Sequence, residues 1–165
     1  MILGGYDASK FEHNNVEFQF AGDISRDLVV GIQSISYSDA KHTDSLLLKE
    51  GIFTFIDATV PQIWLPQDAC KLFEDAFGIT YNNTVDRYLV NDTTHNALLS
   101  QNASIAFELG NDVSGGATVN ITLPYAAFDL EIGSPIVNTT QSYFPLRRAA
   151  NDTQYTLGRT FLQEA

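Results

Sequence analysis

The chain has 165 residues, 44% of them hydrophobic, with a net charge of −11 and a pI near 4.4. Its length suits a single domain over residues 1–165, and its apolar content argues against a disordered chain. The acidity argues against a nucleic-acid or anionic-membrane partner, because either needs a basic surface. No apolar run approaches the ~20 residues that a membrane-spanning helix requires.

Most segments show the alternation or the β-branched and aromatic enrichment that is typical of strands. The expected strands are, in chain order, Val16–Phe20, Leu28–Ser38, two strands within Ser45–Asp57 around a turn at Lys49–Gly51, Asp86–Val90, Ser104–Leu109 and Thr118–Leu123. A hairpin-like turn, "NDVSGGA", separates the last two. In the last strand Val119, Ile121 and Leu123 share one face, which leaves Asn120 on the solvent side.

One helix is predicted in "PQDACKLFEDAFG", where five apolar residues recur at helical spacing between Pro66 and Gly78. Cys70 lies beside this stripe, and we expect it to be a small buried residue. Weaker helical patterns occur in "HNALLSQ", "PYAAFDL" and "GRTFLQEA", and residues 133–153 are expected to form a long loop region. These patterns predict a mostly β domain with a few short helices.

The sequence contains an excess of N-x-S/T sequons. Six of the eleven asparagines occupy one, where chance would give about two with 25 serines and threonines in the chain. We therefore expect an extracellular or cell-surface protein, although the single cysteine alone would suggest the cytosol. Since the first residues lack a signal-peptide pattern, we also expect a piece of a longer protein. The predicted glycosylation sites are Asn82, Asn91, Asn102, Asn120, Asn138 and Asn151.

The order of several short motifs resembles the C-terminal lobe of pepsin-like aspartic proteases. "LGGYDASKF" is similar to the segment that enters that lobe, and "LVVGIQSISYS" to its long first strand. "FIDATVPQIWLP" occupies the place of the second Asp-Thr/Ser-Gly-Thr motif, and "TLGRTFLQEA" that of the Leu-Gly-Asp-x-Phe-Leu motif. The segment "PLRRAANDTQYTLGRTFLQEA" is similar to the corresponding segment of fungal secreted or membrane-anchored members. The resemblance implies a pepsin-like lobe, of the double-psi barrel or sandwich type, whose N-terminal companion lobe is absent here.

The resemblance implies that Asp57 is the second of two catalytic aspartates that share a proton across a cleft between lobes. Its partner and the flap over the substrate would belong to the other lobe. The implied substrate is a peptide or protein, and neither a cofactor nor a metal is implied. Without the resemblance, the residues alone predict that Asp57 is an ordinary aspartate at the end of a strand, hydrogen-bonded to amides of the following turn.

The residues around Asp57 depart from the family motif. Ala58 and Val60 stand where the family has Thr or Ser hydroxyls, and Thr59 stands where it has glycine. We therefore expect Asp57 to have lost hydrogen-bonding support, and Thr59 to be strained if it takes a glycine-only φ. Leu157 and Gly158, by contrast, fit the apolar residue and the glycine that lie under the catalytic loop.

Two functions stay open within the resemblance, and one outside it. The chain is either half of a peptide-cleaving enzyme, inactive on its own, or part of a catalytically retired pseudoprotease that binds a peptide or another partner. An unrelated β-sandwich carbohydrate-binding module would explain the strands and sequons but not the motif order. A missing lobe also predicts an exposed apolar edge and self-association through it.

Other constellations in the sequence are weak. His13, His42 and His95 lack metal-ligand spacing, and no calcium loop, phosphate loop or G-x-S-x-G elbow occurs. Trp64 is expected to pack beneath the catalytic loop, with substrate contact as the alternative. Residues 147–148, both arginines, are expected in a solvated loop, with a processing site as the alternative.

Overall fold

The computed structural model describes residue 9 and residues 13–22 and 27–165, so the expected entry segment, residues 3–11, lies outside the described residues except for Ser9. An eight-stranded sheet has the order β11-β4-β12-β3-β1-β7-β8, with β2 paired to β1. Its strands are β1 (Val29–Ser38), β2 (Ser45–Leu48), β3 (Ile52–Ile56), β4 (Ile63–Leu65), β7 (Ser104–Gly110), β8 (Thr118–Pro124), β11 (Leu146–Arg148) and β12 (Thr156–Leu157).

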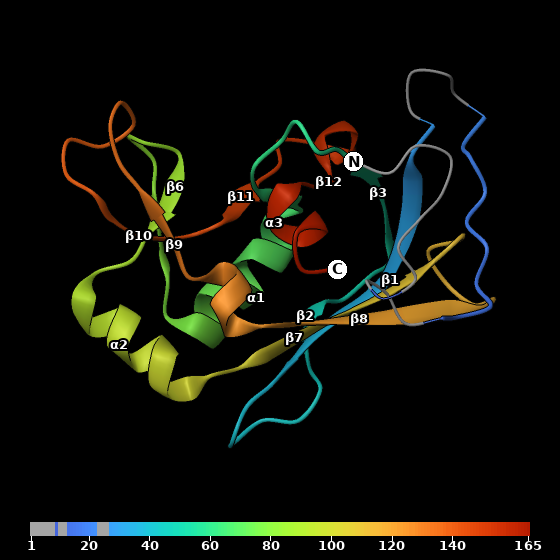
Figure 1. Cartoon of the computed structure of the whole chain (residues 1–165), viewed down its shortest axis with the longest axis horizontal. Helices are drawn as coiled ribbons and strands as arrows, with labels where there is room; N and C mark the ends of the chain where they lie inside the picture. Colours follow the sequence, from blue (N-terminus) through green and yellow to red (C-terminus); the bar gives the residue numbers. More distant parts are fainter. Residues whose placement is uncertain (1–8, 10–12, 23–26) are drawn as a thin grey trace.

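A second sheet of four strands has the order β5-β6-β10-β9. Its strands are β5 (Thr80–Asn82), β6 (Arg87–Leu89), β9 (Leu130–Ile132) and β10 (Gln141–Phe144). The helices are α1 (Gln67–Phe77), α2 (Asp92–Gln101) and α3 (Arg159–Leu162), with 3-10 turns η3 (Tyr125–Phe128) and η4 (Asp152–Gln154). Figure 1 shows α1 and α3 between the small sheet and the long strands β1, β7 and β8. No helix in the described part of the chain has the length and hydropathy needed to cross a bilayer.

The short strand β12 closes the middle of the large sheet. It pairs in parallel with β3, where Thr156 lies opposite Phe55, and antiparallel with β4, where Leu157 lies opposite Ile63. Both β12 residues are buried. The chain between β3 and β4 must therefore pass around the end of β12, and this detour forms the loop that carries Asp57.

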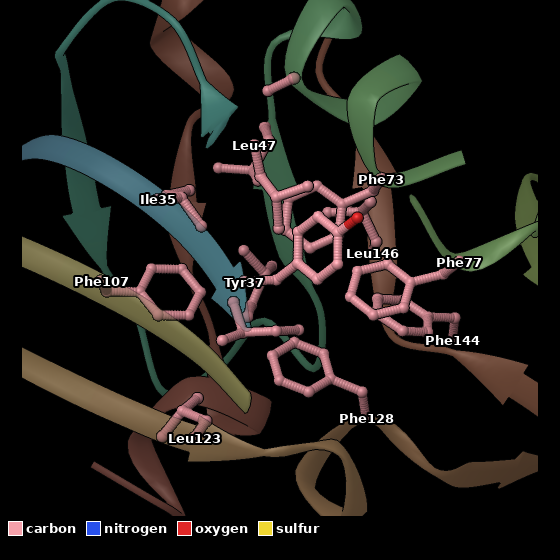
Figure 2. Packing of buried hydrophobic residues seen from close by; sticks show 14 of the residues in the cluster. Ile35, Tyr37, Leu47, Phe73, Phe77, Phe107, Leu123, Phe128, Phe144 and Leu146 are labelled. Atoms are coloured by element: carbon pink, nitrogen blue, oxygen red, sulfur yellow. The ribbon is translucent and has the colours of Figure 1, made fainter. Parts of the chain in front are cut away.

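The core lies between the large sheet, α1 and the small sheet. Alternate residues of β7 face it, and Ile105 and Phe107 are fully buried, as the alternation predicts. Aromatic rings fill the space toward the small sheet: Phe128 stacks on Phe144 at 5.1 Å, and Phe77 lies 5.4 Å from both Tyr37 and Phe144. Figure 2 shows these rings converging from separate elements. One continuous core therefore ties both sheets together.

The predicted helix α1 is confirmed at both ends. Pro66 is its N-cap, and Gly78 ends it in the left-handed conformation with φ of 62°. Cys70 is fully buried, and burial raises the pKa of its thiol to about 12. The weaker helical patterns correspond to α2, η3 and α3.

Two expectations about elements are wrong, and some short strands were not expected. Val16–Phe20 is not a strand, because its alternating residues have no strand to pair with in the described structure, and Phe20 stays 77% exposed. The expected loop region of residues 133–153 instead contains β10 and β11, whose buried Tyr143, Phe144 and Leu146 join the core. β4, around Trp64, was not predicted as a strand because three residues carry no periodicity.

The arginines of β11 lie in the sheet and not in a solvated loop. The Arg147 guanidinium lies 3.9 Å from the Trp64 ring and forms an ion pair with Asp86. Trp64 is thus half-buried, with its ring against a cation on the neighbouring strand. Arg148 binds Glu74 of α1 at 2.7 Å. Stacking and ion pairing account for placing two charges in a sheet.

Candidate active site

Asp57 directly follows β3 and begins the detour around β12. Its backbone amide donates to the Leu157 carbonyl at 3.2 Å, and the Val60 amide donates back to the Asp57 carbonyl at 3.3 Å. The structure thus brings Asp57, Val60 and Leu157 together, as the sequence predicts. Asp57 is half-buried, whereas Ala58 and Thr59 are exposed at the tip of the loop.

Thr59 supplies the hydrogen bonds that hold the Asp57 carboxylate. Its hydroxyl donates to Asp57 Oδ1 at 2.7 Å and its backbone amide donates to the same oxygen at 2.8 Å. These two bonds, the hydroxyl first, hold the pKa of Asp57 below its ordinary value. We expected Asp57 to have lost hydrogen-bonding support, and this expectation is wrong. A hydroxyl donor is present, and it comes from Thr59, the position where the family has glycine.

Thr59 is also free of the strain expected for it. The non-glycine residues with positive φ in the described structure are Asp44, Asp86 and Asn102. Thr59 is not among them, so its φ lies outside the left-handed region that favours glycine. The loop avoids a left-handed turn at this position, and the hydroxyl is gained without a backbone cost.

Gly158 permits the loop to lie against β12 and α3. A Cβ at this position would lie within 3.0 Å of the carbonyl oxygens of Val60 and Gln62. Its φ of −87° is open to any residue, so the requirement is close approach and not backbone freedom. Asp57, Val60, Leu157 and Gly158 therefore belong to one contact, between residues 57–62 and 157–158.

Two residues that the sequence reasoning missed complete this contact. Arg159 donates its backbone amide to the Val60 carbonyl at 2.8 Å, and its guanidinium Nη1 lies 3.2 Å from Ala58 O and 3.3 Å from Thr59 O. Thr160 donates its amide and its hydroxyl to the Pro61 carbonyl. The signal in the sequence was Arg159 itself, a cation where the resembled motif has an acid.

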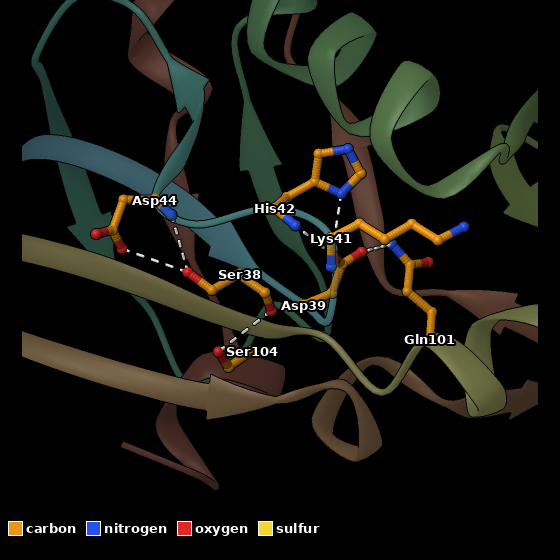
Figure 3. Close-up of polar contacts among 7 residues, drawn as sticks. All are labelled: Ser38, Asp39, Lys41, His42, Asp44, Gln101 and Ser104. Carbon is orange, nitrogen blue, oxygen red and sulfur yellow. Dashed lines mark hydrogen bonds and ion pairs between the residues drawn. The ribbon is translucent and has the colours of Figure 1, made fainter.

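A second aspartate, Asp39, anchors the loop between β1 and β2. Its Oδ1 accepts the amides of Lys41 and His42, each at 2.7 Å, and faces His42 Nδ1 at 2.9 Å; its Oδ2 accepts Gln101 Nε2 of α2 at 2.8 Å. Figure 3 shows both carboxylate oxygens engaged. These bonds, Gln101 first, hold the pKa of Asp39 well below its ordinary range.

The predicted glycosylation sites are spread over the surface. Asn91 caps α2 by accepting the Thr94 amide at 2.9 Å, and Asn102 ends α2 in the left-handed conformation. Asn120 points away from the core, as its strand register requires. Five of the six sequon asparagines are exposed, and Asn82 is half-buried.

A surface hollow of about 410 Å³ lies beside β3, and the Asp57 loop does not line it. Phe53, Phe55 and Tyr155 are among the residues that line it, and Asp57 is not. The Asp57 carboxylate is therefore not part of that hollow.

Comparison with known proteins identifies the fold and not a relative in sequence. No protein-family model matches the chain, and no curated protein matches it. Among solved structures, an aspartic proteinase from Irpex lacteus is similar, with a TM-score of 0.66 over 97% of this chain. The chain has the fold of a pepsin-like lobe. Sequence identity to that proteinase is 15%, so the likeness concerns the fold alone.

As a pepsin-like lobe, the chain covers 45% of the proteinase to which it is similar. The mostly β fold class expected from the sequence is confirmed. The likeness over nearly the whole chain favours the fold of a pepsin-like lobe over that of an unrelated β-sandwich. The catalytic role of Asp57 stays a prediction at this point.

Proposed function

We propose that this chain is the C-terminal lobe of a two-lobed, pepsin-like aspartic endopeptidase, with Asp57 as one of its two catalytic carboxylates. The observation that carries the proposal is the position of Asp57 at the end of β3, on a loop closed over Gly158, with Oδ1 held by Thr59. An Asp held by its own turn amide is common. Its placement at the exposed end of a pepsin-like lobe is what favours catalysis.

The second carboxylate oxygen is the one available for chemistry. Among the described residues, no hydrogen bond to Asp57 Oδ2 is found, whereas Oδ1 has two donors. A carboxylate with one oxygen anchored and the other open can be oriented and still accept a proton from water. General acid–base catalysis needs this combination of fixed geometry and free acceptor capacity.

The proposed reaction is hydrolysis of a peptide bond by Asp57 and an aspartate of the other lobe. The ionised carboxylate takes a proton from water as the water oxygen bonds to the carbonyl carbon, and the protonated partner gives its proton to the carbonyl oxygen. When the carbon–nitrogen bond breaks, the first carboxyl gives its proton to the leaving amine. The partner carboxylate takes a proton back from one hydroxyl on the former carbonyl carbon, which leaves a carboxylic acid and restores both carboxyl groups. Two carboxylates side by side share one proton because both cannot ionise at once.

The competing proposal is a retired protease that keeps the fold as a binding module. Ala58 favours it, because the resemblance places a hydroxyl there that links the two catalytic loops, and alanine cannot make that link. In that case the cleft would bind a peptide without cleaving it.

The experiment uses the intact protein that contains this chain. We expect acid-optimum cleavage of a fluorogenic peptide that pepstatin inhibits, and a loss of about 10³-fold in kcat in Asp57→Asn. Asp39→Asn is the control, because Asp39 also has a lowered pKa but lies on another loop. Binding of the peptide without pepstatin-sensitive cleavage would favour the retired module.

We also propose that the protein passes through the secretory pathway. The support is the six sequons, five of which have exposed asparagines. Treatment of the protein from its native source with an N-glycosidase should lower its apparent mass. An unchanged mass would contradict the proposal.

The missing first lobe is the proposed partner of the face beside β3. Phe53 of β3 is 49% exposed on that face. Without that lobe the face should drive self-association. Sedimentation at rising concentration tests this, and a strictly monomeric chain would contradict it.

A further inference from the structure

In the loop from Asp57 to Pro61, each of the five backbone carbonyls accepts a hydrogen bond. Asp57 O accepts from Val60 N, and Pro61 O accepts from Thr160. The three carbonyls between them, those of residues 58, 59 and 60, all accept from Arg159. One residue from the other side of β12 thus holds the entire tip of the loop.

The guanidinium bond to Ala58 O bears directly on the carboxylate. The peptide unit joining Ala58 and Thr59 is planar and trans, so its C=O and its N–H point in opposite directions. Arg159 Nη1 lies on the carbonyl side at 3.2 Å, and Asp57 Oδ1 lies on the amide side at 2.8 Å. Rotation of this peptide would break both contacts together.

The bond to Thr59 O has a similar effect on the hydroxyl. Arg159 Nη1 donates to Thr59 O at 3.3 Å and to Ala58 O in the preceding peptide. The peptides before and after Thr59 are therefore both restrained. The hydroxyl is then held where it donates to Asp57 Oδ1 at 2.7 Å. Both donors to the carboxylate therefore depend on the orientation of peptides that Arg159 binds.

We infer that Arg159 is a positioning residue, which sets the orientation of the Asp57 carboxylate through the Ala58–Thr59 and Thr59–Val60 peptides. The inference deepens the proposed function and rests on it for its catalytic consequence. Arg159 is exposed, and its guanidinium bonds run to loop carbonyls at the surface. Its effect should therefore appear in loop order and turnover more than in global stability, because surface hydrogen bonds exchange readily with water.

The test compares three variants of Arg159 in the intact protein. Arg159→Met keeps the length of the side chain and removes every donor, whereas Arg159→Lys keeps a charged donor. Arg159→Gln serves as a second donor-poor variant if the methionine variant fails to fold. Lys71→Met, on the exposed side of α1, is the matched control for loss of a surface cation.

Two readouts separate this inference from the proposed function. Amide hydrogen exchange over residues 57–60, followed by mass spectrometry, should be about tenfold faster in Arg159→Met and near the parent rate in Arg159→Lys and Lys71→Met. On a peptide substrate, kcat should fall about tenfold in Arg159→Met with KM within about twofold, because misorientation affects the transition state more than binding.

The outcomes are distinguishable. If the parent protein cleaves nothing, the proposed function fails, and the exchange rates alone still decide whether Arg159 orders the loop. Unchanged exchange in the donor-poor variants overturns the inference, even in an active enzyme. Equal losses in Arg159→Lys and Arg159→Met would also contradict it, since donation to the carbonyls would then not be the cause.

Discussion

The β1–β2 loop and the β3–β4 loop each contain an aspartate whose carboxylate accepts backbone amides of its own loop. The two carboxylates differ in how many of their oxygens are bonded. Asp39 engages both carboxylate oxygens, with donors from its own loop and from Gln101 of α2. In the described part of the chain, Asp57 engages Oδ1 alone, with both donors from Thr59. The pKa of each aspartate lies below its ordinary value. A lowered pKa is therefore common to both, and the free Oδ2 is what distinguishes Asp57 as the proposed catalytic carboxylate.

The two loops also differ in what holds them from outside. The Asp39 side chain ties the β1–β2 connection to α2, so the carboxylate itself joins two elements. In the Asp57 loop the backbone carbonyls take that role, through Gly158, Arg159 and Thr160. The second arrangement leaves the carboxylate available, which is what a reacting group requires. The following substitutions test this contrast.

The largest effect is expected from Gly158→Ala. A Cβ there would press on two carbonyl oxygens of the Asp57 loop, and neither the loop nor β12 can shift without losing backbone hydrogen bonds. We expect a loss of about 3 kcal/mol in the free energy of unfolding, measured with urea. Gly22→Ala is the control, because open space surrounds that position. A neutral Gly158→Ala would mean that the loop contact is loose.

A smaller loss of stability, dependent on pH, is expected from Asp39→Asn. Because the pKa of Asp39 is lowered in the folded state, its contribution is present above its ordinary value of 3.8 and is lost as the pH falls through the folded-state value. The urea midpoint should therefore drop in the variant at pH 6 and approach the parent midpoint in strong acid. A difference that is the same at both pH values would show that the Asp39 charge is not involved.

Thr59→Val should act on the carboxylate with little effect on folding. Valine keeps the shape and removes the hydroxyl donor, so the pKa of Asp57 should rise toward its ordinary value. Titration of the Asp57 carboxyl by NMR measures this, with Thr59→Ser as the control that keeps a hydroxyl. Turnover should fall by roughly tenfold or less, as expected for one charge-assisted hydrogen bond. If the pKa of Asp57 is the same in Thr59→Val as in the parent, the Thr59 hydroxyl does not stabilise the carboxylate.

The smallest effect is expected from Gln101→Leu, which makes Asp39 resemble Asp57 by freeing its Oδ2. The link between the β1–β2 loop and α2 is lost, while the amide bonds within the loop remain. Hydrogen exchange should rise in residues 95–101 and stay unchanged in residues 57–60. Faster exchange in both loops would show that they are not independent.

The sequence predicts the long elements of this fold and misses most of the strands of two or three residues. The alternation of Ser104–Leu109 and the helical stripe from Ala69 to Phe77 identify β7 and α1 because each has enough residues to show a period. β4, β11 and β12 have two or three residues each, and only their neighbours determine them. Val16–Phe20 fails for the opposite reason: alternation without a partner strand does not make a strand.

The site shows the same division. The approach of Asp57 to Leu157 and Gly158 follows from motif order, because a glycine under a loop leaves a trace in the sequence. The bond from Thr59 to Asp57 was missed because each residue was compared with the family position by position. A hydroxyl two residues after the aspartate reaches the same oxygen from a different backbone position. Arg159 was missed, although a cation stands where the resembled motif has an acid, because the main-chain carbonyls that it binds cannot be identified from residue types.

The two residues of β12 have a consequence for biosynthesis. β3 and β4 are made about a hundred residues before Thr156 and Leu157, yet they share no ladder until that pair arrives between them. During translation, the edges of β3 and β4 that later pair with β12 therefore stay unpaired. Unpaired strand edges favour aggregation and binding by chaperones. The lobe can complete its central sheet only once nearly all of it has left the ribosome.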